Sequence, residues 1–292
     1  MLSPIQTYNN ILYKRDDLYK PYDIPISGGK IRQCENLLQP LVDEIRTKYN
    51  NTVAICGSVH STQSVIVSHI ANSLGMESII GIGGKVDFNN HPMLKFCHEK
   101  YGTEIKILSG ISYNSTLYKN LDDYRKKRNF YIVRYFTNLE KHPDAILGSI
   151  SNQVENIPND LDNLVIPTGS GITAAAIILG LNKFNIKPKK VIVVQISGND
   201  RTKDIQRILF RRVGFKSKLL KYQYVAEKTY PYSKFLNVKV ADGFSLDPLY
   251  ESKAHDWLIY RSGIDVKNEK TLFWVVSNST DIREYSRGFS NA

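Results

Sequence analysis

Short apolar runs alternate along the chain with longer segments in which apolar residues recur at helical spacing. The runs are rich in Val, Ile, Leu and Phe without the alternation of half-exposed strands, so we expect strands buried on both faces of a parallel sheet. The predicted strands are 52–56, 78–82, 104–108, 131–135, 163–166, 190–196 and 271–276. The predicted helices are 33–48, 61–74, 92–101, 115–127, 143–154, 171–181, 202–213 and 250–262. This order predicts an α/β protein with parallel-rich sheets covered by helices.

Length and composition fit a globular protein with a packed core. The 292 residues are 42% hydrophobic and 23% charged, enough for one large domain or two of moderate size. No repeat or low-complexity linker separates two halves, so a second domain would have to be inserted into the first.

Nothing in the sequence indicates a secreted or membrane protein. No apolar run reaches 18 residues, and the first residues lack the layout of a signal peptide, so we expect a cytoplasmic protein with no membrane partner. Cys34, Cys56 and Cys97 are widely spaced and odd in number, which favours buried, reduced thiols over disulfides or a zinc site.

Positive charge is concentrated in one segment. The chain has a formal charge of +11, and residues 183–221 alone contribute +10. The basic residues of this segment are Lys183, Lys187, Lys189, Lys190, Arg201, Lys203, Arg207, Arg211, Arg212, Lys216, Lys218 and Lys221, against Asp200 and Asp204. Lys203, Arg207 and Arg211 form one stripe of the predicted helix 202–213, opposite an apolar side. The stripe is either a solvated face or a surface for a polyanion such as nucleic acid.

A lysine follows two glycines in residues 27–32, Ser-Gly-Gly-Lys-Ile-Arg, near the start of a predicted helix. Glycines leave room for a group to approach Lys30, and a lysine so placed can form a Schiff base with the aldehyde of pyridoxal 5'-phosphate (PLP). A plain turn is the alternative.

Two other turns join a predicted strand to a predicted helix. The turn at residues 56–63 carries Ser61, Thr62 and Gln63, which could bind a carboxylate or simply cap the helix. His60 in this turn could act as an acid or base, or be structural. The turn at residues 168–173, Thr-Gly-Ser-Gly-Ile-Thr, offers glycines and hydroxyls to a phosphate but lacks the Walker and dinucleotide spacings. A later segment, residues 246–254, places Tyr250 beside Glu251.

These segments, in this order, resemble the 1-aminocyclopropane-1-carboxylate (ACC) deaminase and D-cysteine desulfhydrase family. That family belongs to the tryptophan-synthase-β-like, fold type II group of PLP enzymes. Its motifs KRDDL, GGNKxRK, GGxxSNQ, GSGGT and DPVYEGKA are similar to residues 14–18, 28–33, 57–63, 169–173 and 247–254.

The resemblance implies a role for each matching residue. Lys30 would form the internal aldimine with PLP and move the substrate proton. Ser61, Thr62 and Gln63 would hold the substrate carboxylate, with Ser61 close to the reacting carbons. Tyr250 would lie over the substrate and Glu251 against the pyridine nitrogen. The cofactor phosphate would be held by Gly169, Ser170, Gly171 and Thr173.

The chain departs from the family at several positions. Gly29 replaces the asparagine before the lysine, Thr62 the asparagine after the serine, and Ile172 the second glycine of the phosphate loop. Tyr230 and Tyr232 are the loose counterparts of the family's GYG tyrosine, and residues 276–279 replace HTGG. The cofactor residues are largely kept, whereas the substrate-facing residues differ.

The sequence therefore predicts a two-domain PLP enzyme of the fold type II group, a likeness that also suggests a homodimer. A smaller α/β domain, 36–145, would be inserted into a larger one, 1–35 and 146–292, with PLP in the cleft between them. The predicted activity is that of a lyase or deaminase that converts a small amino acid to a keto acid and ammonia. Three alternatives stay open: action on an amino-acid group attached to nucleic acid or another anionic carrier, a β-replacement synthase, and a non-catalytic polyanion-binding protein.

Overall fold

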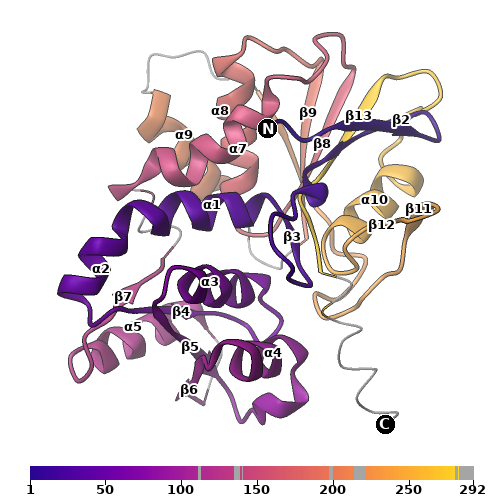
Figure 1. Ribbon diagram of the computed structural model, residues 1–292. Coiled ribbons are helices and arrows are strands. Elements are labelled where there is room, and N and C mark those ends of the chain that lie inside the picture. Colours follow the sequence, from indigo (N-terminus) through magenta and orange to yellow (C-terminus); the bar gives the residue numbers. More distant parts are fainter. Residues whose placement is uncertain are drawn as a thin grey trace. The chain divides into compact units, whose positions relative to one another are not determined.

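The structure, a computed structural model, describes residues 1–110, 113–134, 139, 141–196, 200–213, 221–279 and 282. These residues divide into two compact units (Figure 1). The first unit consists of Met1–Pro21, Ser27–Gly29 and Leu147–Asn278. The second consists of Tyr22–Ile26 and Lys30–Ile146, with the described residues that follow Asn278. The predicted smaller domain, 36–145, falls within the second unit, while its boundaries as a domain stay a prediction.

A six-stranded sheet forms the centre of the first unit. Its order is β1 (Ile5–Tyr8), β2 (Ile11–Arg15), β13 (Thr271–Val275), β8 (Asn163–Thr168), β9 (Lys190–Gln195) and β10 (Gln223–Ala226). All neighbours are parallel except β1 and β2. Every residue of β8 is buried, as its continuous apolar run predicts for a central parallel strand.

Helices cover both faces of this sheet. On one side, α10 (Glu251–Tyr260) packs through Ala254, Trp257 and Leu258 in a core that includes Val165 of β8 and Phe273 of β13. Figure 1 shows three further helices on the other side: α7 (Ser149–Ser151), α8 (Ile172–Lys183) and α9 (Thr202–Val213).

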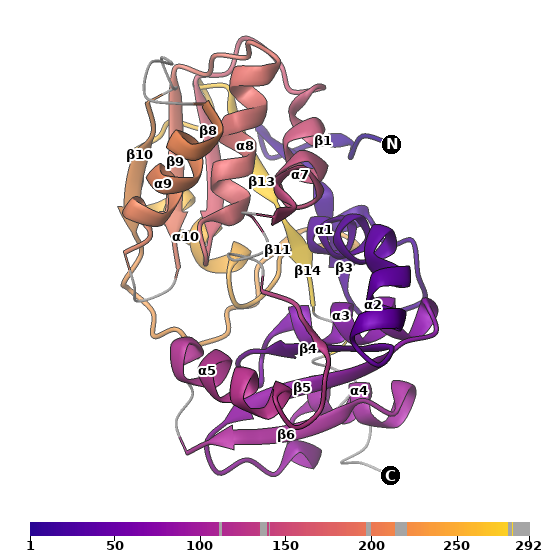
Figure 2. The ribbon, with the colours of Figure 1, turned by 90° about the vertical axis from the view of Figure 1, so that its left-hand side faces the viewer.

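The second unit has a parallel sheet of its own. Its order is β6 (Glu104–Ser109), β5 (Glu77–Gly83), β4 (Thr52–Cys56) and β7 (Tyr131–Ile132). Figure 2 shows α5 (Asn114–Arg125) on one side, and α3 (Thr62–Ser73) and α4 (Pro92–Tyr101) on the other. Leu117 and Leu121 of α5 pack on Ala54 and Ile79 of the sheet. Right-handed crossovers between parallel strands produce this distribution of helices.

The predicted elements are largely confirmed, with differences at breaks. The predicted helix 33–48 is two helices, α1 (Gly29–Leu38) and α2 (Val42–Lys48), separated by a 3-10 turn at Gln39–Leu41 that contains Pro40. Proline lacks the N–H that a continuous helix needs, so the break falls there. The predicted helix 143–154 is a π-helical turn, Asp144–Gly148, followed by α7 and a 3-10 turn at Asn152–Val154. Of the predicted strand 131–135, only Tyr131–Ile132 form a strand, β7, and residue 135 lies outside the described residues.

Several short strands were not predicted. β1 and β2 form a hairpin whose turn, Asn9 and Asn10, has φ of 49° and 64°, the left-handed region that asparagine tolerates in two-residue hairpin turns. The other two pairs are β3 (Ser27–Gly28) with β14 (Ser277–Asn278), and β11 (Lys239–Ala241) with β12 (Phe244–Ser245).

The three cysteines lie in the interior of the protein. Cys34, Cys56 and Cys97 are buried and no disulfide joins them; burial raises the pKa of Cys56 and of Cys97 to about 12. Within the described ranges, no helix is long and apolar enough to cross a bilayer. The same ranges contain no cluster of three or more histidine, cysteine or acidic side chains that could hold a metal ion.

Candidate functional site

The loop that follows β8 has the geometry of an anion-binding turn. β8 ends at Thr168 and α8 begins at Ile172, with Gly171 at the N-cap in a left-handed conformation, φ +88°. Glycine has no side chain to cap the helix, so the N–H groups and dipole of its first turn are directed at the loop. Ser170 is exposed and Thr173 half-buried, and the first turn carries no acidic residue. The loop therefore offers donors to a phosphate.

Packing requires the two glycines of this loop. A Cβ on Gly169 would lie 2.8 Å from Cε1 of Tyr250, and one on Gly171 would lie 2.8 Å from Cγ1 of Ile205. The Gln195 amide fixes the loop by donating to the Gly169 carbonyl at 2.8 Å. Ile172, where the family has a second glycine, is buried in the core and leaves the turn itself unchanged.

Tyr250 is held against this loop at the start of α10. Asp247 Oδ1 accepts hydrogen bonds from the N–H groups of Leu249 (2.9 Å) and Tyr250 (3.3 Å), which fixes the turn into the helix. The hydroxyls of Tyr250 and Tyr232 are 2.6 Å apart. Burial raises the pKa of Tyr250 well above its usual value. Tyr250 therefore keeps its proton at neutral pH and shares a hydrogen bond with Tyr232.

The two tyrosines of the preceding turn have different places. Tyr230 donates its hydroxyl to Asp256 Oδ2 at 3.1 Å, away from Tyr250, whereas Tyr232 meets Tyr250. Lys253 fixes this turn, because its buried Nζ donates to the carbonyls of Pro231 (2.9 Å) and Tyr232 (2.8 Å). Burial lowers the pKa of Lys253. Of the two sequence candidates, the structure brings only Tyr232 to Tyr250.

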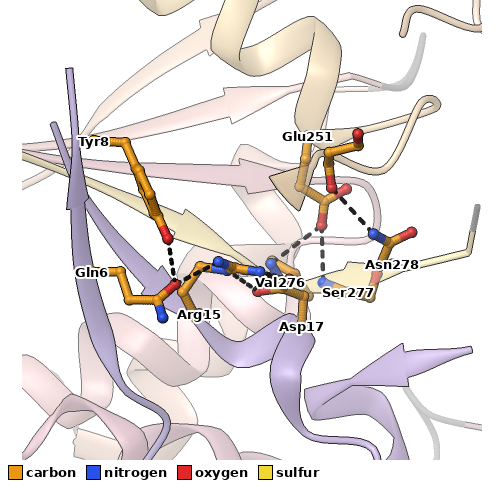
Figure 3. Close-up of polar contacts among 9 residues, drawn as sticks. Gln6, Tyr8, Arg15, Asp17, Glu251, Val276, Ser277 and Asn278 are labelled. Carbon is orange, nitrogen blue, oxygen red and sulfur yellow. Dashed lines mark hydrogen bonds and ion pairs between the residues drawn. The ribbon is translucent and has the colours of Figure 1, made fainter. Parts of the chain in front are cut away.

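Glu251 lies buried beside the carboxyl end of β13. Its Oε1 accepts hydrogen bonds from the backbone N–H groups of Val276 (3.2 Å) and Ser277 (3.1 Å), as Figure 3 shows. Asn278 donates to the carbonyl of Ser245 at 3.1 Å, which fastens the same stretch to β12. The segment that replaces the family's HTGG thus holds this carboxylate in one orientation.

A buried ion pair lies close by in the same view, and the sequence had given it no role (Figure 3). Arg15, at the end of β2, donates through Nε and Nη2 to the Asp17 carboxylate at 2.9 Å each, and its guanidinium lies over the Phe244 ring at 3.4 Å. Burial raises the pKa of Asp17, and Arg15 opposes that shift. Arg15 pairs with Val275, the last residue of β13. The ion pair therefore lies beside Val276 and Ser277, whose N–H groups bind Glu251. The signal in the sequence was an arginine followed directly by two acids.

The two glycines before Lys30 are required by packing as well. Gly28 has φ +123° and pairs with Ser277, and a Cβ there would lie 2.6 Å from the Ser277 Cα. A Cβ on Gly29 would lie 2.6 Å from Cδ1 of Ile150 and still closer to the Asp16 carboxylate. Position 29 therefore has little room for a side chain in this protein. Lys30 follows as the second residue of α1 and is half-buried.

The turn of residues 61–63 begins α3 in the second unit. Ser61 is the N-cap, with φ −77° and ψ 113°, but among the described residues its side chain makes no capping hydrogen bond. Gly57 allows the Ser61 side chain to approach, since a Cβ there would be 3.1 Å from that of Ser61. Ser61, Thr62 and Gln63 are all half-buried. The hydroxyl of Ser61 is thus not used in the cap that was the alternative interpretation.

The structure brings some of the predicted residues together within one unit. The loop from Gly169 to Thr173, Tyr250, Glu251 and Tyr232 all belong to the first unit. Lys30 and the Ser61–Gln63 turn belong to the second, and their meeting with the first group in one site stays a prediction.

A model of the pyridoxal-phosphate-dependent enzyme family matches residues 3–219, about three quarters of the chain. The chain belongs to this family. Its cofactor is therefore PLP, and it is an enzyme. The residues present fit that group: the loop after β8 supplies N–H and hydroxyl donors for a phosphate, and a buried carboxylate, Glu251, lies in the same unit.

Two relatives of this PLP enzyme are named for different activities. A Pyrococcus furiosus protein, provisionally named a 1-aminocyclopropane-1-carboxylate deaminase, is 25% identical over 288 residues, covering 90% of this chain and 83% of its own. A Salmonella phage ViI protein named O-seryl-dTMP PLP-dependent decarboxylase is 26% identical over 212 residues, covering 66% of this chain and 49% of its own.

Solved structures show the fold. A crystal structure of an ACC deaminase homologue has a TM-score of 0.74 at 20% identity and covers 100% of this chain and 94% of its own. Serine racemase from Dictyostelium discoideum has a TM-score of 0.65 at 14% identity, with 95% and 92% covered. The predicted tryptophan-synthase-β-like, fold type II architecture is confirmed.

Proposed function

We propose that this PLP enzyme is a lyase or deaminase that acts on a small amino acid and releases a keto acid and ammonia. One observation carries the proposal: the predicted phosphate loop packs directly on the Tyr250 ring, with Glu251 as the next residue along α10. A loop with donors for a phosphate, a phenol and a buried carboxylate lie in the same unit, which supports carbanion chemistry.

Bound PLP supplies an electron sink for the carbanion that forms when a bond at the substrate's α-carbon breaks. Gly169, Ser170, Gly171 and Thr173 would hold its phosphate at the N-terminus of α8. Glu251 would face the pyridine nitrogen, and its fixed negative charge would favour the protonated ring. The backbone N–H groups of Val276 and Ser277 keep that carboxylate in place.

The second unit would supply the residues that bind the cofactor covalently and hold the substrate. Lys30 would bind PLP through its amino group and later transfer the substrate proton at Nζ. The substrate carboxylate would be held by Ser61, Thr62, Gln63 and the N–H groups at the start of α3. The hydroxyl of Ser61, which does not cap the helix, would lie beside the reacting carbons.

Tyr250 would act as a proton donor. The Tyr232 hydroxyl lies 2.6 Å from Oη of Tyr250 and can replace the proton that Tyr250 gives up. A protonated phenol can give its proton to a carbanion or a leaving group.

The test is an assay of PLP-loaded protein with a panel of small amino acids, measuring keto acid and ammonia. Tyr250→Phe is expected to lower kcat by about a hundredfold, the usual size of a lost general acid. Tyr260→Phe, at the exposed C-terminal end of the same helix, is the matched control and should keep full activity. Full activity in Tyr250→Phe would contradict the role. Product formation only when a thiol is added would instead indicate a β-replacement synthase.

A second candidate is action on an amino-acid group attached to nucleic acid or another anionic carrier. It is supported by the likeness to the phage protein named O-seryl-dTMP PLP-dependent decarboxylase. Assaying carbon dioxide release from an O-seryl nucleotide beside ammonia release from free serine separates the two candidates. Carbon dioxide from the nucleotide alone would favour the second.

A further inference from the structure

Helix α9 exposes a row of cations on one side. Lys203, Arg207 and Arg211 are exposed, and we call them the basic face. Ile205, Ile208 and Leu209 are buried on the other side, so the amphipathic helix predicted from the sequence is confirmed.

The sequence of α9 carries more basic than acidic residues. Residues 201–213 contain five basic residues and one acid, Asp204. Asp204 is contacted by Arg201 at 3.1 Å and by Arg207 at 3.2 Å. Residues 201–213 therefore have a formal charge of +4.

The N-terminal end of α9 adjoins the phosphate loop. A Cβ on Gly171 would lie 2.8 Å from Ile205 Cγ1 and 3.5 Å from the Cβ of Arg201. Both contacts are within the first unit. The N-terminal end of α9 therefore lies beside the loop between β8 and α8, and the contact is made through Ile205 on the buried side of the helix.

The chemistry that fits such a row is the phosphate backbone of nucleic acid. Lys203, Arg207 and Arg211 recur every four residues, which places their side chains about 6 Å apart along one line of the helix. Phe210 lies among them and is 40% exposed, and an exposed aromatic ring between cations is a stacking surface for an unpaired base.

We propose that the basic face of α9 binds a nucleic-acid strand. The inference goes beyond the proposed reaction, because binding by α9 needs neither PLP nor Lys30.

The test measures binding of a fluorescent single-stranded DNA oligonucleotide to the PLP-loaded protein by anisotropy across a salt series. The wild type should bind at low salt, with the logarithm of affinity falling linearly with the logarithm of salt concentration. Lys203→Glu, Arg207→Glu and Arg211→Glu combined should weaken binding at least about tenfold and flatten the slope by about 2, as expected for three lost phosphate contacts.

A matched control changes the same net charge elsewhere. Lys100, Lys119 and Lys127 are exposed in the second unit, and their combined change to Glu should leave binding close to that of the wild type. Equal loss in both triple variants, no binding by the wild type, or retention on anionic vesicles without DNA binding would each overturn the proposal. The absorbance of bound PLP should be unchanged in the α9 variant, and Lys30→Ala should still bind DNA. These two readouts separate failure of this inference from failure of the proposed reaction.

Discussion

The backbone conformation of Gly28 depends on a residue far away in the sequence. Its φ of +123° and its contact with Ser277 come from pairing with β14, about 250 residues along the chain. The sequence indicated that two glycines precede Lys30, but it could not show what approaches them, because no local pattern predicts β14. The physical reason is packing against main chain, which only the folded unit supplies.

At this residue we predict a loss of stability on adding one methyl group. Gly28→Ala places Cβ against the backbone of Ser277 in a conformation that alanine rarely adopts, so the free energy of unfolding should fall by about 2 kcal/mol or more. Urea denaturation measures it. Gly148→Ala is the control, because Gly148 has helical φ and ψ of −61° and −39° and nothing lies within 4 Å of an added Cβ. An unchanged midpoint in Gly28→Ala would refute the packing account.

Tyr230 and Tyr232 illustrate a choice that residue spacing could not make. Both lie in one turn two residues apart, and either could have matched the family's tyrosine. The structure selects Tyr232, because Lys253 binds the carbonyls of Pro231 and Tyr232 and so sets the direction of the turn. A buried lysine among the apolar residues of α10 was the available signal, although its partners could not be read from the sequence.

At the scale of elements, Lys253 joins α10 to the turn that precedes β11. Lys253→Met keeps most of the side-chain volume but removes both hydrogen bonds, which should cost about 1–2 kcal/mol of stability. It should also lower kcat more than it changes KM, because Tyr232 would no longer be held against Tyr250. Urea denaturation and steady-state kinetics test both effects. Lys267→Met, at an exposed position, should change neither quantity; a Lys253→Met enzyme with wild-type kcat would show that the turn holds without this anchor.

The contact of α10 with the sheet predicts a pH dependence of stability. His255 lies against Tyr13, with Nε2 2.8 Å from the hydroxyl, and burial lowers the pKa of His255 from 6.5 to about 4. Below about pH 6.5 the unfolded chain binds a proton that the folded protein does not take up until about pH 4. Stability from this group is therefore complete above pH 6.5 and is lost as the pH falls toward 4, by about 2 kcal/mol at pH 5.

His255→Gln should flatten this dependence. The free energy of unfolding, measured with urea at pH 7.5 and pH 5, should differ between the two pH values by about 2 kcal/mol less in the variant than in the wild type. His98→Gln, at an exposed position, is the control and should leave the difference as it is in the wild type. An equal pH response in His255→Gln and wild type would contradict the account.

Elements with a clear period could be predicted and short pairings could not. The ends of α4 and α9 agree with the prediction residue by residue, because a helix start signal and an amphipathic period coincide there. β1 and β2 were missed because the polar pairs Gln6-Thr7 and Lys14-Arg15 leave neither strand the continuous apolar run of a central strand. β3 and β14 are two residues each, too short for any periodic signal.

At the scale of the whole molecule, the order of motifs predicted more than any one motif. Predicted strands followed by glycine or serine turns and then by helices indicated that the predicted phosphate loop lies at the carboxyl end of the sheet, where ligands bind in parallel α/β sheets. The strand order could not be predicted, since β13 from the C-terminal part enters between β2 and β8. The homodimer, the cytoplasmic location and the joining of both units in one site stay predictions.

The central claim is that Lys30 binds PLP, and one measurement tests it most directly. Borohydride reduction of the PLP-loaded protein fixes the cofactor to the lysine that binds it, and peptide mass spectrometry identifies that lysine. The account predicts PLP on Lys30 in the wild type, and no labelled lysine together with loss of the visible absorbance band in Lys30→Ala. PLP attached to another lysine, such as Lys14 or Lys253, or an unlabelled wild type would contradict it.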